Sequence, residues 1–236
     1  MSVHSFMLRV TPLDDALQQL LSHSLTVTPF PDCISRGTDA WGAALDYGII
    51  REMHREFYYK SEGLVEVTEG VRIDAAPSPL FLLHTKLTGF NPVMASLCAD
   101  EKGLEAAGFI AASVNRAMTY VPGSTDVDTS AECAFFQRKG VCQDYAHLMV
   151  SVCRECGIPA RYVCGFVRGE GETHAWTEVW VDGAWYGFDA TSGQRCDDRY
   201  IALAFGRDAS DCSVNRGLFM GASLQHTETR VKVEFD

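Results

Sequence analysis

Three residues that could together carry out acyl chemistry stand in the second half of the chain: Cys142, His174 and Asp189. A cysteine nucleophile needs a base within hydrogen-bonding reach, and the base needs a group that orients it. A thiolate that attacks an amide carbonyl forms a thioester, which water or an amine can then resolve. These residue types therefore suggest a catalytic triad, provided that the fold brings them together.

Cys142 stands where a helix is expected to begin. From Tyr145 to Cys156 the apolar residues recur at the spacing of an amphipathic helix, with Gly140 just before it and Gly157 just past its end. A thiol in the first turn meets unpaired backbone N–H groups and the positive end of the helix dipole, which favour the thiolate. One of these N–H groups could also stabilise an oxyanion. A structural cysteine is the alternative.

The turn between two expected strands predicts that His174 and Asp189 are neighbours. The segments HAWTEVWV and AWYGFDAT are typical of strands, and the Asp-Gly pair between them is a two-residue hairpin signal. Such a turn pairs Val181 with Ala184. Counting back from there puts His174 diagonally beside Asp189 on one face, about 7–8 Å apart. A one-residue slip would move Asp189 to the other face. The alternative is a hydrogen-bonded pair with no catalytic role.

Other titratable or thiol-bearing residues nearby fit the roles of base, orienting group or nucleophile less well. His147 lies five residues past the nucleophile, so on a helix it points roughly 140° away from it. Glu178 shares the face of the base but lies roughly 13 Å along the strand. Cys153 and Cys156 form a CxxC without a second ligand pair, and the expected helix places both on its apolar face. A core role is therefore expected for the two cysteines, and neither a metal site nor any other cofactor is predicted.

The order of expected elements indicates an α+β chain in two parts. Short β-rich segments and turn residues predict a β-sandwich-like domain over residues 1–78, although residues 12–21 could instead start a short helix. Pro77 and Pro79 interrupt regular structure, and a catalytic domain over residues 79–236 follows. In this second part we expect a helix within 93–118, which Gly103 or Gly108 could break. We also expect a short helix that Ser130 caps at its N-terminus.

Composition excludes several classes of protein. The 236 residues are 47% hydrophobic and carry a formal net charge of -11, which disfavours nucleic-acid binding. No basic run marks a membrane-facing patch, and no apolar run is long enough to span a bilayer. The N-terminus lacks the pattern of a secretory signal, and the nine cysteines are an odd number. We therefore expect a cytoplasmic protein with reduced cysteines.

Two long segments, GVCQDYAHLMVSVCRECGIPARYVCGFV and HAWTEVWVDGAWYGFDATSG, resemble the bacterial transglutaminase-like cysteine proteases. The shared pattern is a Gly-x-Cys-x-Asp helix start, a Gly-Ile-Pro-Ala-Arg turn and a His-Ala-Trp strand, and it covers about residues 115–236. The resemblance implies a papain-like core, in which a nucleophile helix packs on an antiparallel sheet. It also implies the triad Cys142, His174 and Asp189. Ala190 stands where the family pattern has proline.

Three further residues are candidates for substrate or oxyanion contacts. Tyr120 lies where the resemblance implies an aromatic residue near the oxyanion site, and a buried core tyrosine is the alternative. Gln143 follows the nucleophile directly. Trp176 could form the floor of an acyl groove or pack in the sheet. Asp144 is expected to cap the helix N-terminus instead of reacting.

The predicted function is a cysteine enzyme that acts on peptide or protein amide bonds through a thioester. Hydrolysis, as in a peptidase or amidase, is expected in preference to cross-linking, because the sequence has neither a secretion signal nor a calcium-loop pattern. The alternatives are a protein-glutamine acyltransferase or amide synthase, a catalytically silent binding module of the same fold, and a thiol redox protein. The sequence leaves the substrate and the oligomeric state open.

Overall fold

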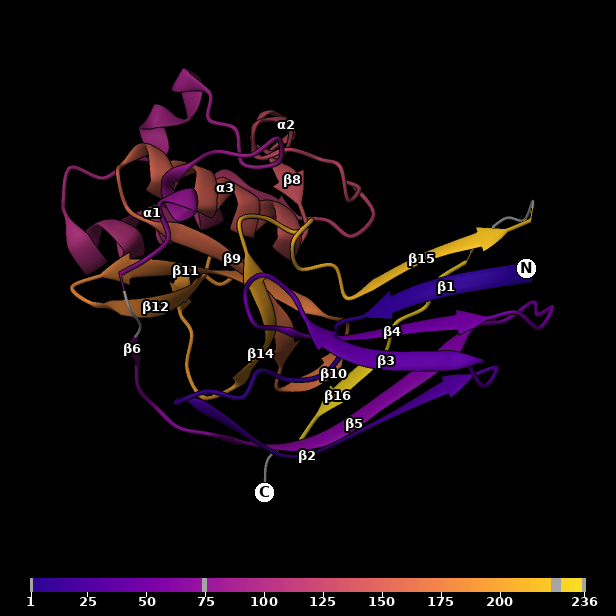
Figure 1. The fold of residues 1–236 in the computed structure, drawn as a ribbon. Helices are drawn as coiled ribbons and strands as arrows, with labels where there is room; N and C mark the ends of the chain where they lie inside the picture. The colour runs from indigo at the N-terminus through magenta and orange to yellow at the C-terminus, as the bar shows by residue number, and fades with distance from the viewer. Residues whose placement is uncertain (1, 74–75, 222–225, 235–236) are drawn as a thin grey trace.

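A computed structural model describes residues 2–73, 76–221 and 226–234, and it divides into a helix-bearing part and a strand-rich part (Figure 1). The strand-rich part contains an antiparallel four-stranded sheet in the order β15-β1-β4-β3. Its strands are β1 (Ser2–Leu8), β3 (Cys33–Thr38), β4 (Ala44–Ile50) and β15 (Asn215–Met220). The last of these comes from the far end of the chain and lies beside β1 (Figure 1).

A long two-stranded sheet packs against this four-stranded sheet. It consists of β2 (Gln18–Thr28) and β5 (Tyr58–Val67), which pair over their whole length. The expectation of a β-rich N-terminal part is therefore confirmed, and the alternative of a helix over residues 12–21 is wrong. Apolar side chains from both layers form a small core between them, as in a sandwich: Phe6, Leu8, Val10, Val27, Ile50.

The second, larger sheet supports the candidate site. Its order is β13-β12-β11-β9-β14, with β6 added on β12, and every pair in it is antiparallel. The bounds are β6 (Arg72–Ile73), β9 (Ala160–Val167), β11 (His174–Val181), β12 (Ala184–Asp189), β13 (Gln194–Arg195) and β14 (Tyr200–Gly206). The predicted strands HAWTEVWV and ARYVCGFV coincide with β11 and β9. Two short pairs complete the described strands: β7 (Thr119–Tyr120) with β8 (Lys139–Gly140), and β10 (Gly169–Gly171) with β16 (Val231–Val233).

The helices lie together on one face of this sheet (Figure 1). They are α1 (Gly103–Ala117), α2 (Ala131–Gln137) and α3 (Cys142–Glu155), with 3-10 turns η1 (Pro79–Leu82) and η2 (Pro92–Leu97) before them. The helix expected within 93–118 therefore begins only at Gly103, which has a φ of +62°. Gly108 does not break it. Ser130 caps α2 as expected, because its side chain accepts a hydrogen bond from the backbone N–H of Cys133 at 3.3 Å.

Helix α3 is the centre of the core. It begins at Cys142 as predicted, and Gly157 follows its end with a left-handed φ of +74°. The predicted single apolar stripe is wrong, because every residue from Asp144 to Arg154 is buried. The sheet, α1 and α2 surround α3 on several sides, so its polar residues are enclosed too. Arg154, for example, donates hydrogen bonds to the carbonyls of Ala160 and Phe81 at 2.9–3.1 Å.

The two predicted domains share strands across residue 78. Strand β6, from the first part, pairs with β12 of the larger sheet, whereas β15, from the second part, pairs with β1. Each part therefore supplies one strand to the sheet of the other. The division of the chain at residue 78 into two independently folding domains stays a prediction.

Candidate active site

Cys142 opens α3, and the residues around it explain the Gly-x-Cys-x-Asp spacing. The Asp144 carboxylate turns back and accepts hydrogen bonds from the Val141 backbone N–H at 2.7 Å and the Thr125 hydroxyl at 2.6 Å. Burial raises the pKa of Asp144, although these two donors stabilise its ionised form. Gly140 packs directly on this carboxylate, because a Cβ at that position would lie 2.6 Å from it. Asp144 therefore caps the helix, as expected, and fixes the backbone that carries Cys142.

His174 and Asp189 meet across the predicted hairpin. The turn pairs Val181 with Ala184, and the register continues to Thr177 opposite Phe188 without a slip. This register brings Nε2 of His174 to 2.9 Å from Oδ2 of Asp189. The contact leaves Nδ1 as the ring nitrogen that can face Cys142. The turn-based prediction of this pair is confirmed as a contact.

The environment of His174 favours its protonated form. Burial of the ring opposes the charge, but hydrogen bonds with Asp189 and with the Cys142 thiol outweigh burial and raise the pKa of His174 to about 9. The side chain is 21% exposed, so one edge of the ring still reaches solvent. An imidazolium held beside a thiol stabilises the thiolate by direct charge attraction.

Asp189 has two partners that the sequence analysis missed. Its Oδ1 accepts hydrogen bonds from the backbone N–H of Thr191 at 2.8 Å and from the Thr191 hydroxyl. Its Oδ2, which contacts His174, also accepts the hydroxyl proton of Tyr200 at 3.0 Å. Burial would raise the pKa of Asp189, but the bonds from His174 and Thr191 lower it below the ordinary value. The Asp-x-Thr spacing is a local turn signal, whereas Tyr200 lies on another strand.

Asn115 of α1 supports the end of β12. Its side-chain amide donates hydrogen bonds to the carbonyls of Ala190 at 3.2 Å and Thr191 at 2.6 Å. The strand ends at Asp189, so alanine at position 190 leaves the expected strand end unchanged. This contact ties the helix layer to the loop that presents Asp189.

The three candidates for substrate contacts differ in their surroundings. Tyr120 is 50% exposed, so the alternative of a buried core tyrosine is wrong. Burial of part of its ring and the nearby Cys142 raise the pKa of Tyr120, and its hydroxyl lies at the backbone of Cys142. Gln143 donates to the Asp126 carbonyl at 3.4 Å, beside the same helix start. Trp176 is only 3% exposed, which favours packing, and its substrate role stays a prediction.

The residues set aside by sequence reasoning have structural partners. His147 is fully buried, and its Nε2 accepts the Ala209 N–H at 3.1 Å. Burial lowers the pKa of His147 to about 4. Glu178 forms ion pairs with Arg72 and Arg161. Cys153 is buried in the core.

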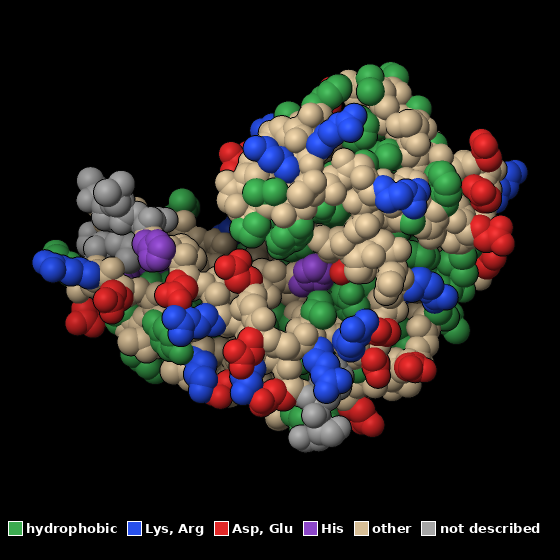
Figure 2. All heavy atoms as spheres, turned by 180° about the vertical axis from the view of Figure 1, so that it is seen from behind, with side chains coloured by type: hydrophobic (Ala, Val, Ile, Leu, Met, Phe, Trp, Pro, Cys, Tyr) green, Lys and Arg blue, Asp and Glu red, His purple; other side chains and the backbone are tan. Residues whose placement is uncertain are grey.

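The surface seen in Figure 2 carries charged side chains of both signs. On the face in Figure 2, Lys and Arg side chains are interspersed with Asp and Glu. Within the ranges that the structure describes, no three His, Cys, Asp or Glu residues are arranged to hold a metal ion. None of the described helices combines the length and hydropathy needed to cross a membrane.

Known families match this chain in two consecutive blocks. Residues 1–66 match the bacterial transglutaminase-like N-terminal region, and residues 93–190 match the core of the transglutaminase-like superfamily. The chain therefore has a transglutaminase-like core behind a bacterial transglutaminase-like N-terminal region. Cys142, His174 and Asp189 of this transglutaminase-like protein all fall within the second block. The resemblance seen in the sequence is therefore confirmed.

Relatives extend the match to nearly the whole transglutaminase-like chain. An uncharacterized protein of Mycobacterium leprae is 28% identical over 95% of this chain and 90% of its own length. A protein-glutamine gamma-glutamyltransferase of Pseudomonas aeruginosa is 35% identical over 88 residues, which are 32% of this chain and 13% of that protein. A solved structure of a candidate cysteine protease from Cytophaga hutchinsonii has a TM-score of 0.84 at 26% identity, covering 100% of this chain and 87% of that one. The α+β fold with a transglutaminase-like core is thereby confirmed.

Proposed function

We propose that this protein is a cysteine enzyme that acts on amide bonds of peptides or proteins through a thioester on Cys142. The observation that supports this proposal most strongly is the chain of contacts from the thiol to His174 and on to Asp189, with His174 and Asp189 2.9 Å apart. This arrangement holds an imidazolium beside the sulfur. A structural cysteine would need neither partner.

In the proposed reaction, the Cys142 thiolate attacks the carbonyl carbon of the amide. The oxyanion receives a hydrogen bond from the backbone N–H of Cys142, and the Tyr120 hydroxyl is the candidate second donor. When the C–N bond breaks, the imidazolium of His174 gives its proton to the departing amine. His174 then accepts a proton from water, which attacks the thioester and releases a carboxylic acid and the thiolate. Asp189 keeps the ring oriented and balances its charge throughout.

We propose hydrolysis as the outcome and transfer to an amine as the second candidate. The likeness to a candidate cysteine protease extends over 100% of this chain, which supports hydrolysis. The likeness to the glutamyltransferase is confined to 32% of the chain but reaches 35% identity, which supports the second candidate. The acceptor depends on whether water or an amine reaches the thioester first.

The experiment that tests nucleophile activation is competitive alkylation. We expect iodoacetamide at pH 6 to modify Cys142 before Cys33 and Cys133, even though those two are more exposed. Peptide mapping by mass spectrometry gives the order. Equal or faster labelling of the two exposed cysteines would contradict an activated nucleophile and favour the silent binding module.

The reaction class is read by incubation with a peptide library with and without added amines. Mass spectrometry distinguishes a new carboxylate from a new amide. Cys142→Ala should abolish both products, whereas the matched variant Cys133→Ala should leave them unchanged. Products that persist in Cys142→Ala would show that another group does the chemistry.

A further inference from the structure

Tyr200 makes a contact with the triad that no local motif explains. It is the first residue of β14, and its hydroxyl donates a hydrogen bond to Oδ2 of Asp189 at 3.0 Å. The same oxygen is the one that His174 contacts at 2.9 Å. The other carboxylate oxygen is held by Thr191. Tyr200 therefore acts on the oxygen that orients the base.

We propose that Tyr200 is a positioning residue that sets the angle at which Asp189 meets His174. The two carboxylate oxygens turn together about the Cβ–Cγ bond of Asp189. Both donors of Thr191 hold Oδ1, and the Tyr200 hydroxyl holds Oδ2, so the planar group is restrained from both sides. Small displacements of a base or its orienting group cost large factors in rate, because attack and proton transfer need near-ideal geometry. This proposal rests on the proposed function of the triad.

Aromatic contacts hold the Tyr200 ring in place. It meets Trp176 edge-on, with ring centroids 5.3 Å apart, and Trp176 in turn stacks beside His174 at 6.5 Å. Gly165 of β9 permits this arrangement, because a Cβ there would lie 2.7 Å from the Trp176 ring. Burial and the neighbouring Asp189 raise the pKa of Tyr200 far above its ordinary value, so the hydroxyl remains a donor. The ring and its proton are both fixed.

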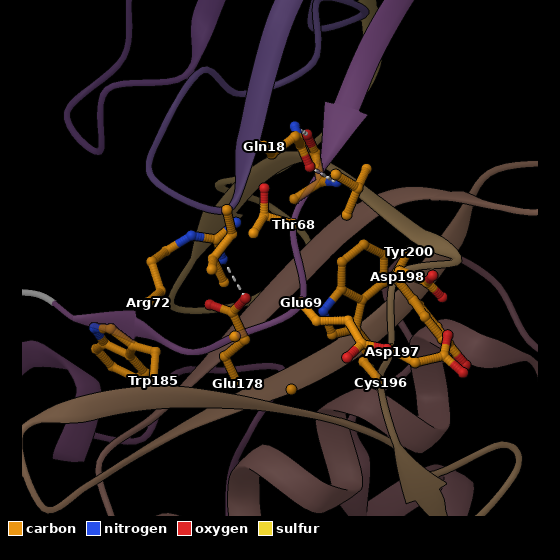
Figure 3. A pocket seen from close by; sticks show the side chains of 16 residues that line it. Gln18, Thr68, Glu69, Arg72, Glu178, Trp185, Cys196, Asp197, Asp198 and Tyr200 are labelled. Carbon is orange, nitrogen blue, oxygen red and sulfur yellow. Dashed lines mark hydrogen bonds and ion pairs between the residues drawn. The ribbon is translucent and has the colours of Figure 1, made fainter. Parts of the chain in front are cut away.

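The N-terminal part of the chain anchors the strand that carries Tyr200. The side-chain amide of Gln18 accepts a hydrogen bond from the Ala202 N–H at 2.7 Å and donates to the Ala202 carbonyl at 2.8 Å. A cavity of about 260 Å³ lies between the end of the two-stranded β2–β5 sheet and the larger sheet, lined in part by Gln18, Thr68, Cys196 and Tyr200 (Figure 3). Tyr200 borders this cavity and is not packed on every side. The hydrogen bonds between Gln18 and Ala202 therefore help to keep β14 in place.

The test compares Tyr200→Phe with Tyr186→Phe. Both changes remove one hydroxyl from the same sheet, but Tyr186 packs against Arg195, and strand alternation points it to the opposite face of β12 from Asp189. The titration of His174 is followed by NMR of histidine-labelled protein, with its resonance assigned from a His174→Gln sample. We expect Tyr200→Phe to lower the His174 titration midpoint by about one pH unit, because a carboxylate held only through Oδ1 keeps Oδ2 less well aligned with the imidazolium. Tyr186→Phe should leave the midpoint unchanged.

A midpoint that stays the same in Tyr200→Phe would overturn the positioning role. A midpoint that rises would overturn it too, since it would mean that Tyr200 only weakens Asp189 as an acceptor. Alkylation of Cys142 at pH 6 in the wild type keeps the two proposals apart. If the wild-type thiol is not selectively labelled, the proposed function fails. If it is labelled and the midpoint does not fall, only the role of Tyr200 fails.

Discussion

Replacing Asp189 by Asn tests whether the carboxylate charge keeps His174 protonated. The contact with Asp189 makes the largest upward contribution to the pKa of His174, which stands at about 9 against an ordinary value of 6.5. The difference corresponds to about 3 kcal/mol, at 1.36 kcal/mol per pH unit. Asparagine keeps the size of the side chain and removes the charge, while burial of the ring continues to oppose protonation. The Cys142 contact still raises the pKa while burial lowers it, so we expect the pKa of His174 to fall to about 6.5, its ordinary value.

At neutral to alkaline pH this change in pKa strongly lowers the protonated fraction of His174. At pH 8 a group with a pKa near 9 is about 90% protonated, and one at 6.5 is about 3% protonated, so the imidazolium population drops about thirtyfold. The NMR titration measures the midpoint directly, and iodoacetamide labelling at pH 7 reports the accompanying loss of Cys142 reactivity. Asp197→Asn is the matched control, because Asp197 pairs with Arg199 outside the triad. A His174 midpoint that remains near 9 in Asp189→Asn would refute the reasoning.

Three further predictions follow from the site. Gly140→Ala should destabilise the protein by about 1–3 kcal/mol in urea unfolding, because the new Cβ would displace the Asp144 cap. An unchanged free energy of unfolding would mean that the backbone around Gly140 adjusts without loss of stability. Tyr120→Phe should lower kcat about tenfold with little change in KM if its hydroxyl stabilises the oxyanion, and a pure KM effect would contradict that role. The folded state raises the pKa of His174, so its stabilising contribution is complete below pH 6.5 and is lost as the pH rises through about 9. Urea unfolding of the wild type should show this loss of about 3 kcal/mol over that window, whereas the asparagine variant described above should not.

Local signals in the sequence predicted the features that depend on a few neighbouring residues. The hairpin register followed from its Asp-Gly turn, where Asp182 and Gly183 adopt φ values of +48° and +88°. The extent of α3 followed from its apolar spacing, from Gly140 just before its start and from Gly157 past its end. The hairpin register alone was sufficient to predict that His174 lies beside Asp189.

Features that depend on distant segments could not be predicted in the same way. Tyr200 reaches Asp189 from a strand on the other side of β9, and Gln18 reaches Ala202 from the opposite end of the chain. A periodicity argument shows which face of a helix is apolar but not how many neighbours enclose it, so the burial of both faces of α3 between Asp144 and Arg154 was missed. The exchange of strands between the two parts had no sequence signal either, because β15 and β6 are short and largely polar or exposed.

The pairing of β15 with β1 affects how the protein is made. Phe6 pairs with Gly217, more than 200 residues later, so β1 leaves the ribosome long before its neighbour exists. Contacts of such large sequence separation slow folding, because the intervening chain must be closed into a loop first. Until synthesis passes β15, one edge of β1 has open hydrogen-bonding groups that can pair with other chains. Newly made protein is therefore most prone to aggregation just before its final strands emerge.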